Sequence, residues 1–193
     1  MGITTRLIDA AERKFGEKLD YLRDIASASP AAFYKLALFL AFARHRKAAP
    51  LDAYYLSSIG ALLSEDCGPC LQIAVNQALA EGVSPSIISS ALAGGASLDA
   101  DRKLYLDFGR AVSANEPEAE EMRLKLAEKL SPAAMVDLAI AIAGARVFPA
   151  LKRGLGHAKS CSLVQIKVPG LAPKTARFAD SRPLEESESM KFG

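Results

Sequence analysis

The chain of 193 residues contains no long basic block, no long apolar stretch and few runs of β-branched side chains. Its 24 basic and 22 acidic side chains leave a formal net charge of +2, which gives no support for a nucleic-acid surface. The apolar run from Leu36 to Ala43 is too short for a bilayer span, which takes about 20 residues. Because β-branched runs favour strands, their scarcity predicts a helical protein.

The N-terminal segment also lacks the uninterrupted apolar stretch of a secretory signal. Acidic residues appear early, at Asp9 and Glu12, so we predict no signal peptide and no membrane segment. Three cysteines without a secretory signal indicate a reducing, cytoplasmic location. In that compartment a C-x-x-C motif is more often catalytic or metal-binding than structural.

Helix punctuation is the clearest local signal in the chain. Three serine-proline pairs, at 29–30, 84–85 and 131–132, each combine an N-cap serine with a proline at the first helical position. Apolar residues recurring every three to four positions then predict an all-α fold. The expected helices span about 5–25, 30–46, 51–63, 67–82, 85–93, 98–114, 118–130 and 132–151.

Two of these helices carry further expectations. The helix from Pro30 is apolar on most sides, which predicts burial in the centre of the fold or in a subunit interface. In the last helix, Pro149 is expected to introduce a kink or an early end, because proline removes a backbone donor and clashes with the preceding turn.

The chain divides into a helical domain over 1–156 and a C-terminal tail over 157–193. Within the tail, 162–168 reads as one short strand, bounded by Pro169-Gly170. The remainder is rich in proline and charge and has little apolar periodicity. We expect it to be extended or disordered, or draped over a neighbouring subunit.

A pair of cysteines, Cys67 and Cys70, lies where the fourth expected helix begins. Their spacing puts both sulfurs within one turn, close enough for a disulfide. A helix N-terminus stabilises a thiolate, with Asp66 expected as the N-cap, whereas the negative charges of Glu65 and Asp66 oppose it. We place Cys67 near the exposed tip of the helix, which favours it as the attacker on another protein's disulfide.

The segment 51–95 resembles the alkylhydroperoxidase D-like and carboxymuconolactone decarboxylase superfamily. The similarity lies in Leu51-Asp52-Ala53-Tyr54-Tyr55, in Cys67-Gly68-Pro69-Cys70 and in the run 78–84. It implies an all-α multi-helix bundle that forms homo-oligomers. It also implies reduction of a hydroperoxide by the second cysteine, Cys70, with Cys67 as the resolving thiol and an external dithiol protein as the reductant.

Three positions depart from the pattern of the redox members. Tyr55 stands where they carry a glutamate, and Pro69 and Ala74 stand where they carry histidines. Glu65, Asp66, Tyr55 and Gln72 are candidates to replace the missing proton relay. Cys-Gly-Pro-Cys is also the tetrapeptide of thioredoxin, but no strand precedes the motif and no βαβ pattern surrounds it.

The resulting hypothesis is a thiol-dependent oxidoreductase, acting as a peroxidase or in disulfide exchange, with Cys67, Cys70, Glu65 and Tyr55 as site residues and no cofactor or metal. The resemblance also allows a second enzymatic reading, lactone decarboxylation, although the cysteine pair counts against it because that chemistry does not need it. The non-enzymatic alternative is a helical oligomer with redox-sensing, metal-binding or structural cysteines. A zinc site would combine the pair with His157 and Cys161.

Overall fold

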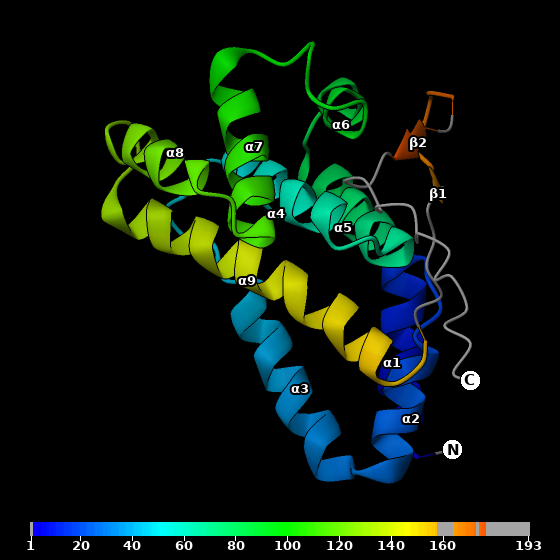
Figure 1. The fold of residues 1–193 in the computed structure, drawn as a ribbon. Coiled ribbons are helices and arrows are strands. Elements are labelled where there is room, and N and C mark those ends of the chain that lie inside the picture. The colour runs from blue at the N-terminus through cyan, green and yellow to red at the C-terminus, as the bar shows by residue number, and fades with distance from the viewer. Residues whose placement is uncertain (1, 158–163, 173, 177–193) are drawn as a thin grey trace, which may run out of the picture.

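The computed structural model describes residues 2–157, 164–172 and 174–176 (Figure 1). Within these residues, the chain forms nine helices and one short antiparallel strand pair, so the all-α prediction is confirmed. The elements are α1 (Ile3–Phe15), α2 (Asp20–Ala28), α3 (Pro30–Ala43), α4 (Leu51–Ser64), α5 (Gly68–Glu81), α6 (Pro85–Leu92), α7 (Ala100–Ala114), α8 (Glu118–Ala127), α9 (Pro132–Gly154), β1 (Val164–Ile166) and β2 (Lys174–Ala176).

Helix α4 is the centre of the main core and is buried along nearly its whole length. It packs most extensively against α7 and next against α9 (Figure 1). Glycines make the α4–α7 approach possible, because a Cβ on Gly60 would overlap the Leu106 carbonyl and one on Gly109 would overlap the Ser57 carbonyl. The two helices are therefore fixed at a distance that larger side chains do not permit.

Among the described residues, α9 is the one helix long and apolar enough to cross a membrane by length and composition. It packs against α3, α4 and α7, and its buried side chains include Asp137. These contacts are typical of the core helix of a compact protein. The helix also runs through Pro149 to Gly154, so the expectation of an early end at the proline is wrong.

The three serine-proline starts are confirmed. The hydroxyls of Ser29, Ser84 and Ser131 each accept a hydrogen bond from a backbone N–H in the first turn of α3, α6 and α9, at 3.2–3.3 Å. Gly82 ends α5 with a φ of 104°, a left-handed conformation that glycine adopts without strain. Short-range signals thus set most helix boundaries.

The first expected helix is two helices. Gly16 ends α1 with a φ of 71°, and the Leu19 N–H donates to the Glu12 carboxylate at 3.0 Å before α2 begins. The apolar stripe from Leu7 to Ile25 continues across this break because both helices pack on one small core. That second core consists of Ile8, Phe15, Leu19, Tyr21 and Phe33.

Helix α3 is not buried at the centre of the chain, which corrects one of the two expectations for it. Of its apolar residues only Phe33 and Ala43 are buried. Leu38 is 73 % exposed and Phe42 is 54 % exposed, so an apolar face is turned to the outside. The other expectation, a subunit interface, stays a prediction.

The described part of the tail is more regular than expected. Strand β1 pairs with β2 in antiparallel register, with Gln165 opposite Thr175, so the single expected strand is half of a hairpin. Ile166 and Val168 are buried in the main core, and β1 packs against α5 of the same chain. The expectation of a strand within 162–168 is confirmed for 164–166, while the expectations for 177–193 lie outside the described residues.

Candidate functional site

The cysteine pair lies at the junction of α4 and α5. Cys67 is the N-cap of α5 and Cys70 lies in its first turn, and the structure joins them in a disulfide with Cα atoms 5.3 Å apart. Cys67 is 4 % exposed and Cys70 is 7 % exposed. The expectation that Cys67 sits at an exposed tip is therefore wrong, because both cysteines belong to the main core.

Asp66 is not the N-cap of α5, as the sequence suggested. It adopts a left-handed conformation with a φ of 48°, which turns it away from the capping position that Cys67 occupies. Its Oδ1 atom is buried without a hydrogen-bond partner in the described part of the chain. Burial raises the pKa of the Asp66 carboxyl, against the opposing charge of Arg153. A carboxyl with a raised pKa thus stands directly before the first cysteine.

Glu65 is engaged in a different way. Its carboxylate accepts from Arg153 Nη2 at 2.6 Å and from Arg146 Nε at 3.0 Å, and Arg153 Nη1 also donates to its backbone carbonyl at 2.7 Å. Burial acts to raise the pKa of Glu65, but the two arginines outweigh it and the pKa is lowered. Glu65 therefore ties the cysteine loop to α9, and its low pKa makes it a weak proton acceptor.

Tyr55 lies two turns before the end of α4 and is buried. Burial raises the pKa of its hydroxyl, and the Glu81 carboxylate raises it further. The phenol therefore stays protonated and can act as a hydrogen-bond donor rather than as a base. Tyr55 is also distant from the cysteine end of α4. Leu62, which is near that end, lies about 10 Å further along the helix axis.

Gln72, the last candidate for the proton relay, is occupied by the tail. Its side-chain Nε2 donates to the Lys167 carbonyl at 3.1 Å, and its Oε1 accepts from the Lys167 N–H at 2.8 Å. The same Nε2 also donates to Asn76 at 2.8 Å. With its amide satisfied on both sides, Gln72 holds the hairpin against α5.

A cavity of about 270 Å³ lies beside the pair, between the main core and the second core. Cys70, Ile73, Ala74 and Gln77 line it from α5, at the spacing of one helix face. Tyr55 and Leu62 line it from α4, and the remaining wall is mostly apolar. The additional lining residues come from α1, α2, α3 with its C-cap Arg44, and α9, and they include Phe15, Tyr21, Phe33, Ala37, Phe148 and Lys152. The sequence held no signal for this cavity, since its walls are distant in the chain.

The two histidines each lie near a carboxylate. His45 Nε2 is 3.7 Å from Asp137 Oδ1, and His157 Nε2 is 2.5 Å from Asp24 Oδ2. Within the described ranges no group of three or more histidine, cysteine, aspartate or glutamate side chains is arranged to hold a metal ion. The zinc alternative also needs Cys161, which lies outside the described residues.

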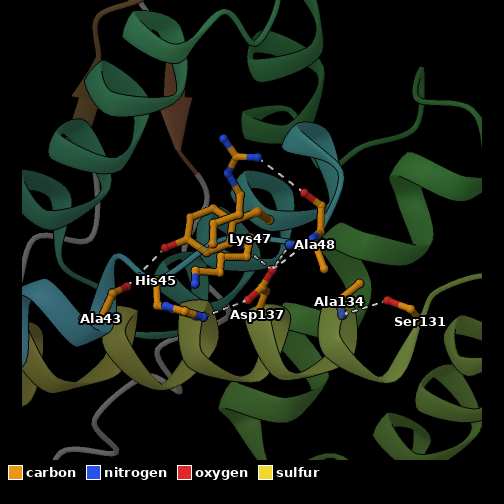
Figure 2. A network of polar contacts seen from close by, with 10 residues as sticks. Ala43, His45, Lys47, Ala48, Ser131, Ala134 and Asp137 are labelled. Atoms are coloured by element: carbon orange, nitrogen blue, oxygen red, sulfur yellow. Dashed lines mark hydrogen bonds and ion pairs between the residues drawn. The ribbon is translucent and has the colours of Figure 1, made fainter.

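A network of polar contacts surrounds Asp137, away from the cysteine pair in the chain (Figure 2). Its Oδ2 accepts from the backbone N–H groups of Lys47, Ala48 and Ala49 at 2.9, 2.7 and 2.9 Å. This carboxylate, 2 % exposed, fixes the loop between α3 and α4 onto α9. The cluster is structural, and sequence reasoning missed it because the partners are about ninety residues apart.

Neither a protein-family model, nor a curated protein, nor a solved structure matches this chain. Function is therefore argued from the geometry of the cysteine pair and of the cavity beside it.

Proposed function

We propose that the protein is a thiol-dependent oxidoreductase that reduces a hydroperoxide with the Cys67–Cys70 pair. The observation that carries the proposal is the position of Cys70, which lies in the first turn of α5 and lines an apolar cavity. A thiolate at a helix N-terminus is stabilised by the free backbone N–H groups and the helix dipole. The cavity offers a route by which a small substrate reaches it.

The reaction begins with the reduced pair. The Cys70 thiolate attacks the distal oxygen of the hydroperoxide, the O–O bond breaks, and the alkoxide leaves as an alcohol after taking up a proton. Cys70 is then a sulfenic acid. The Cys67 thiol attacks its sulfur, which releases water and forms the disulfide. A dithiol reductant returns two electrons and two protons in a further exchange.

We propose Asp66 as the group that handles the proton. Glu65 is held by two arginines and Gln72 by the tail, whereas Asp66 Oδ1 has no partner in the described structure. A carboxyl whose pKa is raised by burial accepts a proton more readily than an ordinary one and can return it. Tyr55, with its raised pKa, is assigned as a donor that lines the same cavity.

Burial favours a small substrate over a protein disulfide. Disulfide exchange requires the attacking sulfur to reach a second sulfur in line, and both cysteines are less than a tenth exposed. A hydroperoxide that enters the cavity meets Cys70 without any opening of the fold. Reduction of the pair by a dithiol requires either a slender reductant or local opening of the loop at 65–67.

The test is intact-mass spectrometry of the reduced protein, mixed with stoichiometric cumene hydroperoxide and sampled over seconds. The expected result is rapid loss of two hydrogens in the parent protein and in Cys161→Ser, the matched control. Cys67→Ser is expected to stop at the gain of one oxygen, and Cys70→Ser is expected not to react. The attacking thiol is the one whose replacement by serine prevents the reaction, and the resolving thiol is the one whose replacement leaves the sulfenic acid.

Two results would overturn the proposal. One is a reaction no faster than that of a free thiol, which would leave the pair as a sensing or structural disulfide. The other is undiminished turnover in both serine variants.

The proposal includes a cytoplasmic homo-oligomer. The exposed apolar face of α3, which contains Tyr34, Leu38 and Phe42, is the surface on which we expect two copies to meet. Sedimentation of Leu38→Glu against the parent protein tests this expectation, and an unchanged mass would contradict it.

A further inference from the structure

We infer that the cavity beside Cys70 binds a monocarboxylate with an unbranched apolar chain, with the carboxylate on Lys152. The inference names a ligand class for the proposed oxidoreductase site. It also stands without the redox chemistry, because it concerns binding alone.

The first step is the state of Lys152. Its side chain is 6 % exposed and lines the cavity from α9. Its ammonium lies 5.2 Å from the centre of the Tyr21 ring, an arrangement that stabilises the positive charge only partly. Within the described residues, Lys152 Nζ has no hydrogen bond and no salt bridge. A side chain buried to this degree, whose ammonium has no ion pair among the described residues, is suited to receive an anion.

The second step is the charge around it. Glu17 is the acidic side chain whose charge acts on Lys152, but burial raises the pKa of Glu17 and no ion pair joins the two. Burial also lowers the pKa of Lys152 itself. A ligand carboxylate that reaches Nζ would supply a paired counter-charge and favour the charged form of the lysine.

The third step is the shape of the cavity. The α9 residues that line it run from Ala141 to Lys152, which is about 16 Å along the helix axis. Between these ends the wall is dominated by apolar side chains, among them Leu36, Leu40 and Phe148. A chain of methylene groups extending from Lys152 fits that lining, whereas a compact polar ligand does not.

A second cation lines the cavity and is the competing anchor. Arg44 is exposed and lies over the Phe15 ring, with its guanidinium carbon 5.9 Å from the ring centre. Because Arg44 is hydrated, an anion gains less from it than from a buried ammonium. We therefore assign the carboxylate to Lys152.

The test is calorimetric titration of the oxidised full-length chain with decanoate and with decanol. The oxidised protein has no free thiol at the pair, so failure of the redox proposal would not alter the result. We expect decanoate to bind at least about tenfold more tightly than decanol. Lys152→Met should remove this preference and leave decanol binding in place, while Lys152→Arg should retain it.

Arg44→Gln and Lys125→Met are the matched controls, since Arg44 is the competing cation and Lys125 is an exposed lysine of α8 paired with Glu121. Circular dichroism and thermal unfolding establish that each variant is folded. If Lys152→Met does not fold, Lys152→Arg and the comparison of decanoate with decanol still decide the question. The inference is overturned if decanoate does not bind, if decanol binds equally well, or if Arg44→Gln rather than Lys152→Met abolishes the preference.

Discussion

The side-chain amide of Gln72 pairs with both backbone groups of Lys167, accepting from its N–H at 2.8 Å and donating to its carbonyl at 3.1 Å. Gln72 thereby takes the place of a neighbouring strand for the residue that follows β1. It lies two residues after Cys70, so the tail hairpin is anchored directly behind the cysteine pair. Ile166 and Val168, on either side of Lys167, are buried in the main core.

Substitution of Gln72 tests this anchor. Gln72→Ala leaves the two backbone groups of Lys167 without partners, which should cost about 1–3 kcal/mol of unfolding free energy. Gln72→Glu keeps the acceptor and loses the donor, so it should be milder. Hydrogen exchange at residues 164–168 should accelerate in the order parent, Glu, Ala. Equal exchange in all three would show that the apolar contacts alone hold the hairpin.

Asp137 is expected to be a major source of stability in the helical domain. Asp137→Ala leaves the N–H groups of Lys47, Ala48 and Ala49 without their acceptor, which should cost about 3 kcal/mol or more. Asp137→Asn keeps one acceptor oxygen and should lose less. Urea unfolding at neutral pH measures the free energy of unfolding of both variants. A loss in Asp137→Ala no larger than that of an ordinary surface substitution would contradict the stabilising role of Asp137.

The same carboxylate should contribute to acid sensitivity. Burial acts to raise the pKa of Asp137, but the three backbone N–H groups and His45 outweigh it, so the folded-state pKa lies below the ordinary 3.8. A lowered folded pKa means that the contribution is present above 3.8 and is lost as the pH falls through the folded value. The stability difference between parent and Asp137→Asn should therefore shrink from pH 6 to pH 2, and a constant difference would contradict this.

Close packing of α4 on α7 predicts a strong effect of a single methyl group. Gly60→Ala and Gly109→Ala each place a Cβ against a backbone carbonyl of the facing helix and should cost about 3 kcal/mol or more. The matched control is Gly154→Ala at the end of α9, where a Cβ has no neighbour within 4 Å. That control should be neutral or slightly stabilising. Thermal unfolding of the three variants separates the two effects of the added methyl group. Gly154→Ala reports helix propensity alone, whereas Gly60→Ala and Gly109→Ala also report the overlap with the facing helix.

Glu65 and Asp66 are adjacent and are expected to respond in opposite ways. Glu65→Gln weakens the two arginine contacts and should lower stability by about 2 kcal/mol. The raised folded pKa of Asp66 means that stability falls as the pH rises from the ordinary 3.8 to the folded value, so Asp66→Asn should stabilise the protein at neutral pH. Asparagine also tolerates the left-handed backbone at this position.

The reaction rates should distinguish the two roles further. With Asp66→Asn we expect slower thiol oxidation and a changed pH midpoint, whereas Glu65→Gln should keep the midpoint. Stopped-flow oxidation of the reduced protein between pH 5 and pH 9 measures both. An unchanged profile in Asp66→Asn would remove Asp66 from the proposed proton transfer.

The sequence by itself determined the helical character of the chain and most helix boundaries. Serine-proline starts at α3, α6 and α9 and the glycine end of α5 act within a few residues, so they can be read without the fold. The same holds for the disulfide spacing of Cys67 and Cys70, because one helical turn brings them together. The break at Gly16 was missed because both helices present the same apolar stripe to one core.

Only the tertiary structure decided the setting of the cysteine pair. The arginines that engage Glu65 come from α9, more than eighty residues away in the chain, and the partner of Gln72 comes from the tail. The cavity exists because α1, α2 and α3 pack against α4, α5 and α9. Burial of Lys152 follows from that packing, because Tyr21 of α2 lies against its ammonium. Contacts between distant segments leave no local pattern in the sequence, so these features appear only when the chain is folded.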